Sequence, residues 1–345
     1  MKNSKLFFIC CILFLMSWVI YLFKPFWLTM MTGFLLSIAT SVLYGKILKF
    51  TNNKELLSSF IITLGLCLLF LIPLIYAVTK AAIYIATIDF GTGPYAKTIS
   101  FIQNFELNLP SKLSFIEVRA KETLASIDLT SLSKSVVSYI SKFGKSGANF
   151  VVDMLLIVVF YFFANYYGQK MSNIIKEQAP MDSKQIDYIL SEVTNTMSVV
   201  FYSTISSAVL QGFLFGVIAT IFGYDGVLMG ILYAFASLIP VVGGAVVFVP
   251  VVLFELANGN IASAIIILAY TIIIISIVAD NFLKPLIIKF ISSKIVTSAS
   301  NINEIVIFFA MLAGMTTFGF WGIILGPAIV TLFVALLKSY KIFNL

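Results

Sequence analysis

The chain of 345 residues contains no histidine and only three cysteines. Without histidine it lacks the commonest metal ligand, the usual general base and the usual near-neutral proton carrier. Cys10, Cys11 and Cys67 lie inside apolar runs, and their spacing matches neither a disulfide framework nor a metal motif. We therefore expect no metal and no cofactor, and we expect the cysteines to act as small apolar packing residues.

Charge is equally scarce. Charged residues make up 11% of the chain and apolar residues 60%, and the mean hydropathy is +1.06. A soluble domain typically carries about 25% charged residues, so the composition excludes both a soluble globular enzyme and a disordered chain. The net charge of +7 comes mainly from lysines between apolar runs, which is typical of membrane flanks rather than of a nucleic-acid surface. We expect the lipid bilayer as a partner and no nucleic acid.

Long uncharged runs recur along the chain, and a spanning helix needs about 20 predominantly apolar residues. The runs are Leu6–Phe23, Pro25–Gly45, Leu56–Thr79, Met154–Gln169, Val193–Tyr224, Gly226–Phe254, Leu256–Ala279 and Ile305–Leu337. The first run is too long for a signal peptide and no A-x-A site follows it, so we interpret it as a retained helix. Runs of this length cross a membrane only as helices. The sequence thus predicts an all-α integral membrane protein with about eight membrane segments.

Composition also divides the chain into regions. Residues 1–88 hold three predicted transmembrane helices, and residues 89–147 mix charges, serines and short apolar clusters, which predicts a small helical extracytoplasmic insert. Residues 148–198 predict a fourth transmembrane helix followed by an amphipathic cytoplasmic segment, because apolar residues recur there at helical spacing. Residues 199–345 are the predicted C-terminal transport core.

Lysine placement predicts the orientation. If four spans precede Lys170, the lysine groups near both termini and near residues 46–54 and 170–184 all lie on one side. The positive-inside rule makes this side cytoplasmic. We therefore expect a multi-pass protein of a bacterial inner membrane with both termini in the cytoplasm.

The C-terminal half contains helix-breaking residues inside apolar runs. Proline removes a backbone donor and glycine weakens a helix, so we predict broken helical hairpins over residues 226–255 and 305–337, either re-entrant or fully spanning. The interrupting residues of the first are Pro240, Gly243, Gly244 and Pro250. Those of the second include Gly319, Gly322, Gly326 and Pro327. We expect the first set to contribute to a substrate pathway or gate, and the second to hairpin packing.

A polar group follows the run that ends at Ala279. It comprises Asp280, Asn281, Lys284 and Pro285. Asp280 and Lys284 have the favourable order for a helical ion pair. If these residues only marked the membrane interface, Lys284 would be explained, because its charge could extend to the surface. Asp280 and Asn281 would not be explained. Since polar groups inside a membrane usually face a cavity and broken helices form transporter sites, we favour a gate on the substrate pathway, with Pro285 ending the helix.

Other motifs carry less weight. Glycine pairs four residues apart, at 212 and 216, 226 and 230, and 322 and 326, favour close helix packing. The side chains of Ser203, Ser207 and Gln211 could either bond within helices or line a polar path. Asp153, Glu255 and Glu304 lie at the ends of runs and are weaker site candidates. The sequence "FGKSG" lacks the first glycine of a P-loop, since Tyr139 occupies that position, so nothing indicates an ATP-driven pump.

The second half of the chain, from about Tyr202 to Lys338, resembles the autoinducer-2 exporter family of bacterial membrane transporters. The segments that carry the resemblance are, in order, "LIPVVGGAVVFVPVVLFELANGN", "DNFLKP" and "FGFWGIILGP". The resemblance implies a secondary transporter that works as a homo-oligomer, a pentamer being one expected form. It also implies a small-molecule substrate.

Two transport functions remain open. Family members are linked to export of autoinducer-2 or to sodium/proton exchange. An antiporter usually needs a carboxylate deep in the membrane, whereas the acids here lie at run ends. We therefore favour export of a small polar metabolite, with autoinducer-2 as a candidate, and keep a sodium/proton antiporter as the alternative. An enzyme is not expected, because the chain lacks a nucleophile–base set and metal ligands.

Overall fold

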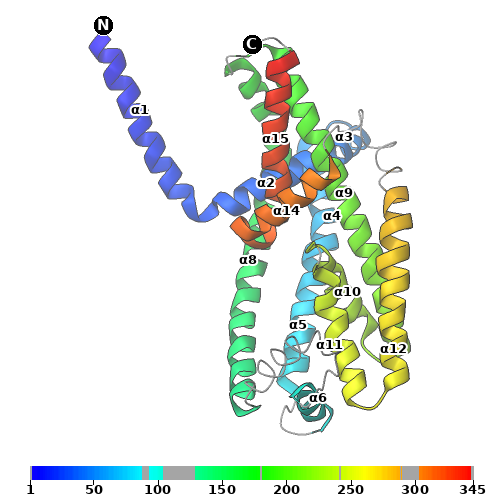
Figure 1. Ribbon diagram of the computed structural model, residues 1–345. Helices are drawn as coiled ribbons and strands as arrows, with labels where there is room; N and C mark the ends of the chain where they lie inside the picture. The colour runs from blue at the N-terminus through cyan, green and yellow to red at the C-terminus, as the bar shows by residue number, and fades with distance from the viewer. Residues whose placement is uncertain are drawn as a thin grey trace, which may run out of the picture. The chain divides into compact units, whose positions relative to one another are not determined.

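The computed structural model describes residues 2–87, 93–103, 129–178, 181–240, 242–287, 289 and 303–342. All regular secondary structure in these ranges is helical (Figure 1). Within them, six helical stretches are long and apolar enough to span a membrane, and α10 and α11 are shorter apolar helices. The prediction of an all-α fold with about eight apolar segments is confirmed.

The chain forms two compact units. Unit 1 comprises Met1–Gly65, Asp153–Ser198 and Ser300–Leu345, and unit 2 comprises Leu66–Val152 and Val199–Ala299. The helices α8 (Leu129–Gln178) and α9 (Ser183–Ile221) each contribute one part to either unit. α8 is one continuous helix, so it runs through the boundary that we predicted between residues 147 and 148.

Unit 1 contains the N-terminal helices and the C-terminal pair. Its further elements are α1 (Lys2–Phe23), η1 (Lys24–Phe26), α2 (Trp27–Ala39), α3 (Ser41–Phe50), α4 (Glu55–Leu66), α14 (Glu304–Phe318), η5 (Gly319–Trp321) and α15 (Gly322–Ile342). α2 contacts α8 so closely that a Cβ at Gly33 would lie 2.8 Å from the Phe160 Cβ. Two buried hydrogen bonds reinforce this region. One joins the Thr40 and Tyr161 hydroxyls (2.8 Å), and in the other the Ser198 hydroxyl donates to the Ala39 carbonyl (2.8 Å).

α14 and α15 pack against each other as a helical pair. Gly319 between them has a φ of +64°, a conformation that glycine adopts without strain. Backbones then meet directly: a Cβ at Gly326 would lie 1.9 Å from the Ala310 carbonyl oxygen, and one at Gly322 would lie 1.9 Å from that of Gly314. We call these four residues the α14–α15 seam. Pro327 lies inside α15, so Gly319, not the proline, interrupts this run.

Unit 2 surrounds α11. Its further elements are η2 (Cys67–Leu71), α5 (Ile72–Thr87), α6 (Gly93–Gln103), α10 (Gly226–Ser237), α11 (Gly243–Ala257), α12 (Ile261–Tyr270) and η4 (Thr271–Leu283). α11 contacts α10, α12 and α6 (Figure 1). The buried apolar core of this unit includes Phe215, Tyr233, Val251 and Ile267, and the rings of Phe215 and Tyr233 stack with centroids 4.5 Å apart.

The predicted break in residues 226–255 lies between α10 and α11, around Pro240. Gly243 then begins α11 where a Cβ would lie 1.9 Å from the Ala236 carbonyl oxygen. Pro250 was expected to break the helix as well, and this was wrong: it lies inside α11. Apolar helices tolerate an internal proline when neighbouring groups compensate for the missing hydrogen bond.

Candidate functional site

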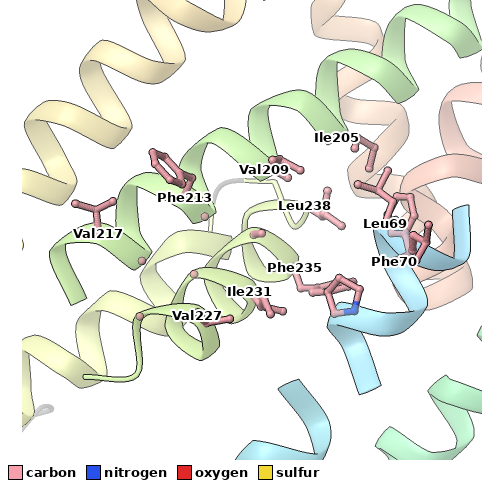
Figure 2. Close-up of a pocket in the computed structure, with 18 of the residues that line it drawn as sticks. Leu69, Phe70, Ile205, Val209, Phe213, Val217, Val227, Ile231, Phe235 and Leu238 are labelled. Atoms are coloured by element: carbon pink, nitrogen blue, oxygen red, sulfur yellow. The ribbon is translucent and has the colours of Figure 1, made fainter. Parts of the chain in front are cut away.

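A groove runs along α9 and α10 in unit 2 and has a volume of about 510 Å³. Its walls come from α9, from α10, and from η2 with the start of α5, and Figure 2 shows side chains from each wall, including Val209, Phe213, Ile231, Phe235 and Leu69. We call it the α9–α10 groove. Of its lining side chains, Thr220 alone is polar, and its hydroxyl donates to the Gly216 carbonyl of the same helix at 2.9 Å. The groove therefore presents an almost wholly apolar surface.

The groove exists because α9 and α10 meet along glycines. A Cβ at Gly212 would lie 2.5 Å from the Gly230 carbonyl oxygen, and one at Gly216 would lie 2.7 Å from that of Gly226. These four residues form what we call the α9–α10 seam. The glycine pairs at 212 and 216 and at 226 and 230 thus pack closely, as their spacing predicted. The larger side chains beside the seam form the groove, and Val209, Phe213 and Val217 leave it open on one side, being 52%, 68% and 41% exposed.

The three residues predicted as polar lining do not line this groove. Ser203 is buried and donates to the Val200 carbonyl at 3.2 Å, which is the intrahelical alternative. The Ser207 hydroxyl is buried and has no hydrogen-bond partner among the described residues. Gln211 is half-buried. A polar path through these residues stays a prediction.

The polar group after Ala279 lies on helical backbone of unusual geometry. Residues Thr271–Leu283 form the π-helical segment η4, which contains Asp280 and Asn281. Asn281 is exposed, and its amide nitrogen donates to the Ile277 carbonyl at 2.9 Å. Lys284 and Pro285 are exposed, and the Asp280 side chain lies outside the described part, so the ion pair stays a prediction. The backbone remains helical through Ile287. Pro285 thus does not end the helix, since it lies in the α-helical turn that directly follows η4.

The predicted hairpin residues occupy packing positions. Pro240 lies in the turn between α10 and α11, and a Cβ at Gly244 would lie 2.5 Å from the Tyr233 hydroxyl. Neither Pro240, Gly243, Gly244 nor Pro250 lines the α9–α10 groove. Gly319, Gly322, Gly326 and Pro327 belong to unit 1. The role of the first set in a substrate pathway and that of the second set in hairpin packing stay predictions.

Glu255, a weaker site candidate in the sequence, lies in a buried polar cluster. This residue is 6% exposed and accepts two hydrogen bonds, from the Tyr224 hydroxyl at Oε1 and from the Asn260 amide nitrogen at Oε2, the latter at 2.9 Å. We call these three residues the Glu255 cluster. The signal for it was an acid near the end of an apolar run, with an amide a few residues beyond in "ELANGN". Among the residues that the structure describes, no group of three or more acids or cysteines is placed to hold a metal ion.

Comparisons with known proteins identify transport proteins as relatives of this chain. The profile of the family described as "AI-2E family transporter" matches residues 7–342. A protein of Helicobacter pylori strain 26695, provisionally named a transport protein, is 33% identical over 334 residues, which is 96% of this chain and 94% of the relative. A protein of Aquifex aeolicus with the same provisional name is 26% identical over 250 residues, 71% of this chain and 67% of the relative. The chain therefore belongs to the AI-2E transporter family and is a multi-pass membrane protein.

Proposed function

We propose that this protein is a secondary transporter that exports a small uncharged organic molecule, and that the molecule contacts the α9–α10 groove. The observation that supports this is the groove itself, which is elongated along two helices and has a single polar side chain in its lining. A charged substrate would lose its hydration there without gaining a partner. The lining therefore favours a neutral metabolite over a charged one. Autoinducer-2 is the candidate to test first.

Filling the groove should stop transport. In the variant Ile231→Trp, the indole would occupy space between α9 and α10 that a substrate needs, because Ile231 lines the groove. We expect export of autoinducer-2 from proteoliposomes to fall at least about tenfold, the rate effect of roughly 1.4 kcal/mol. The matched control is Ile266→Trp on α12, which is 49% exposed and outside the groove. Equal rates in the two variants, with equal amounts of inserted protein, would remove the groove from the pathway.

The polar group Asp280, Asn281, Lys284 and Pro285 is proposed as a gate on the same pathway. Support comes from its chemistry at the end of an apolar helix, and from the π-helical geometry of η4, since π-helical turns occur frequently at functional sites. The expected contributions are an acid–base pair from Asp280 and Lys284 and an exposed amide from Asn281.

A sodium/proton antiporter is the alternative, and one observation favours it. Glu255 supplies a buried carboxylate in unit 2 that is hydrogen-bonded but paired with no basic side chain among the described residues. Parallel flux measurements on one preparation distinguish the two functions. Export of autoinducer-2 without sodium movement supports the first, and sodium movement driven by a proton gradient without autoinducer-2 export supports the second.

The proposed orientation places both termini in the cytoplasm of a bacterial cell, and assembly as a homo-oligomer, with a pentamer as one form, belongs to the same proposal. After replacement of the native cysteines, Ser100→Cys on α6 and Ser183→Cys at the start of α9 provide exposed probes. We expect an impermeant thiol reagent to label the first from outside intact cells and the second only after lysis. The opposite pattern would reverse the orientation.

A further inference from the structure

The part of α8 that belongs to unit 1 has two distinct faces. The side chains of its buried face are at most 5% exposed, and they are Met154, Ile157, Tyr161, Ala164 and Asn165. The other face carries large side chains four residues apart, which are 47%, 49%, 48% and 42% exposed, namely Leu155, Val159, Phe163 and Tyr167. Residues at this spacing lie one above another on a helix. They form a continuous exposed column, which we call the α8 column.

Four aromatic rings gather at one end of the column. The ring of Phe163 stacks on that of Tyr167, with an interplanar angle of 13° and centroids 6.2 Å apart. The ring of Phe162 stacks on that of Tyr166 in the same way, at 8° and 6.3 Å. The two tyrosine rings meet edge to face with centroids 4.7 Å apart. We call these four residues the α8 ring cluster. Because the rings pack against one another, both phenol groups are positioned before a ligand binds, which lowers the entropy cost of binding.

A lysine lies directly beyond the ring cluster. The Lys170 Nζ lies 5.7 Å from the centroid of the Tyr167 ring, a distance at which an aromatic face attracts a cation. Lys170 is exposed and forms no ion pair among the residues that the structure describes, whereas Lys176 of the same helix is paired with Asp187 at 2.6 Å. The hydroxyls of Tyr166 and Tyr167 likewise have no hydrogen-bond partner within the described part of the chain. This end of α8 therefore offers one cation and two neutral donors to a ligand.

We propose that the α8 column, the α8 ring cluster and Lys170 together bind one anionic phospholipid of the surrounding bilayer. The phosphate of such a lipid is negatively charged and accepts hydrogen bonds, so it fits an ammonium group beside two phenol donors. An acyl chain of the same lipid then lies along the column. From Leu155 to Tyr167 the column is about 18 Å long, at 1.5 Å per residue. Half of a hydrocarbon core of about 30 Å is about 15 Å, so the column matches the depth of one leaflet.

The two parts of the site favour an anionic lipid over other phosphates. Inorganic phosphate would contact Lys170 and the phenol groups but would gain nothing from the apolar column. A zwitterionic lipid would gain from the column, but its own ammonium group already neutralises its phosphate, so Lys170 would add less attraction. An anionic phospholipid uses both parts.

α5 provides a matched comparison within the same chain. The Lys80 Nζ lies 5.9 Å from the centroid of the Tyr76 ring, so the same two residue types form a pair there. Within the described residues Tyr76 contacts no other ring, and the stacked cluster is therefore missing. The variant Lys80→Gln removes a cation above a tyrosine without altering the proposed site.

Native mass spectrometry of the purified full-length chain in detergent tests the site, with dioleoylphosphatidylglycerol or dioleoylphosphatidylcholine added. The wild-type protein should bind the phosphatidylglycerol more tightly. Lys170→Gln should weaken this binding about fivefold, the contribution of one lysine near an anionic surface. The double variant Tyr166→Phe with Tyr167→Phe keeps all four rings but removes both hydroxyls, and it should weaken binding at least about tenfold, since each hydroxyl donates to a charged group. Lys80→Gln should bind like the wild type.

Equal affinities for the two lipids in the wild-type protein, or an unchanged affinity in Lys170→Gln, would overturn the proposal. Lys170→Arg keeps the charge and should keep the selectivity. If an excess of sodium phosphate displaced the phosphatidylglycerol, the site would take free phosphate and the lipid assignment would be wrong. If the double variant changed the number of associated chains but not lipid binding, this face would be a contact between copies of the chain instead. None of these measurements depends on which molecule the protein transports.

Discussion

Replacing Gly326 with leucine is expected to prevent stable folding of unit 1. A Cβ at this position would already lie 1.9 Å from the Ala310 carbonyl oxygen. The end of a flexible side chain could move aside by changing rotamer, but a backbone atom cannot. Overpacking of a well-packed interior typically costs about 1–3 kcal/mol and occasionally more, and here the added atoms force α14 and α15 apart along the whole seam. Little monodisperse protein should remain after extraction in mild detergent.

Alanine variants provide the sharper comparison. Gly326→Ala should lower the thermal midpoint, because even one methyl group meets backbone. Gly168→Ala should leave it unchanged or raise it, since no atom lies within 4 Å of a Cβ there and alanine is favoured over glycine inside a helix by about 0.5–1 kcal/mol. If both variants moved the midpoint in the same direction, close backbone contact would not be what holds α14 against α15.

Removing one partner of the ion pair between Glu192 and Lys338 is expected to give the second large loss of stability. The Lys338 Nζ lies 3.3 Å from Oε1 of Glu192, and the two side chains are 31% and 11% exposed, the lysine being the more exposed. Leaving a fully buried charge unpaired costs roughly 3–5 kcal/mol. We expect about 2 kcal/mol for Lys338→Ala, since water reaches part of the pair. The pair joins α9 to α15 within unit 1, so the loss should appear as a lower thermal midpoint in detergent.

A double-mutant cycle isolates the contribution of the pair. Glu192→Ala combined with Lys338→Ala should be less destabilised than the sum of the single variants, because neither charge is then left alone. Strictly additive single and double variants would mean that the two charges are solvated separately. High salt should have little effect on a partly buried pair, in contrast to a surface pair.

The membrane architecture could be predicted because many consecutive residues carry the same signal. A helix in lipid must satisfy its own backbone and present apolar side chains for about 20 residues, and such runs are visible without any tertiary information. Glycine spacing likewise indicated close packing, and Gly212, Gly216, Gly226 and Gly230 do meet across α9 and α10. These predictions depend on residue type and local spacing alone.

Predictions that depended on neighbours were less successful. Pro250 and Pro327 both lie inside helices, because a proline breaks a helix only where nothing nearby replaces its lost hydrogen bond. Gly319 could equally have been helical; its positive φ is visible only in the structure. Glu255 appeared peripheral in a linear sequence, and its burial results from two turns that converge on it from distant segments.

The α9–α10 groove was not predictable for a different reason. Its lining residues, such as Phe213, Ile231 and Phe235, are the same types that face lipid or fill a core elsewhere in the chain. In a sequence, polar groups inside an apolar run are the visible sign of a pathway, and here they indicated Ser203, Ser207 and Gln211. The groove forms where the small residues of the α9–α10 seam lie beside large side chains. This arrangement depends on the register of α9 and α10, which the sequence does not reveal.

The π-helical segment η4 implies a mechanical property of the polar group that follows it. Its hydrogen bonds connect residues five apart instead of four, so each turn holds more of the chain than an α-helix would. If η4 gave up one residue of this surplus and became α-helical there, everything beyond it would rotate about the helix axis by about 100°, the angle per residue of an α-helix. Asn281 and Lys284 would then face another direction without any hinge or loop in the backbone. In such a helix, the loss of one surplus residue would turn the segment that follows by a fixed angle.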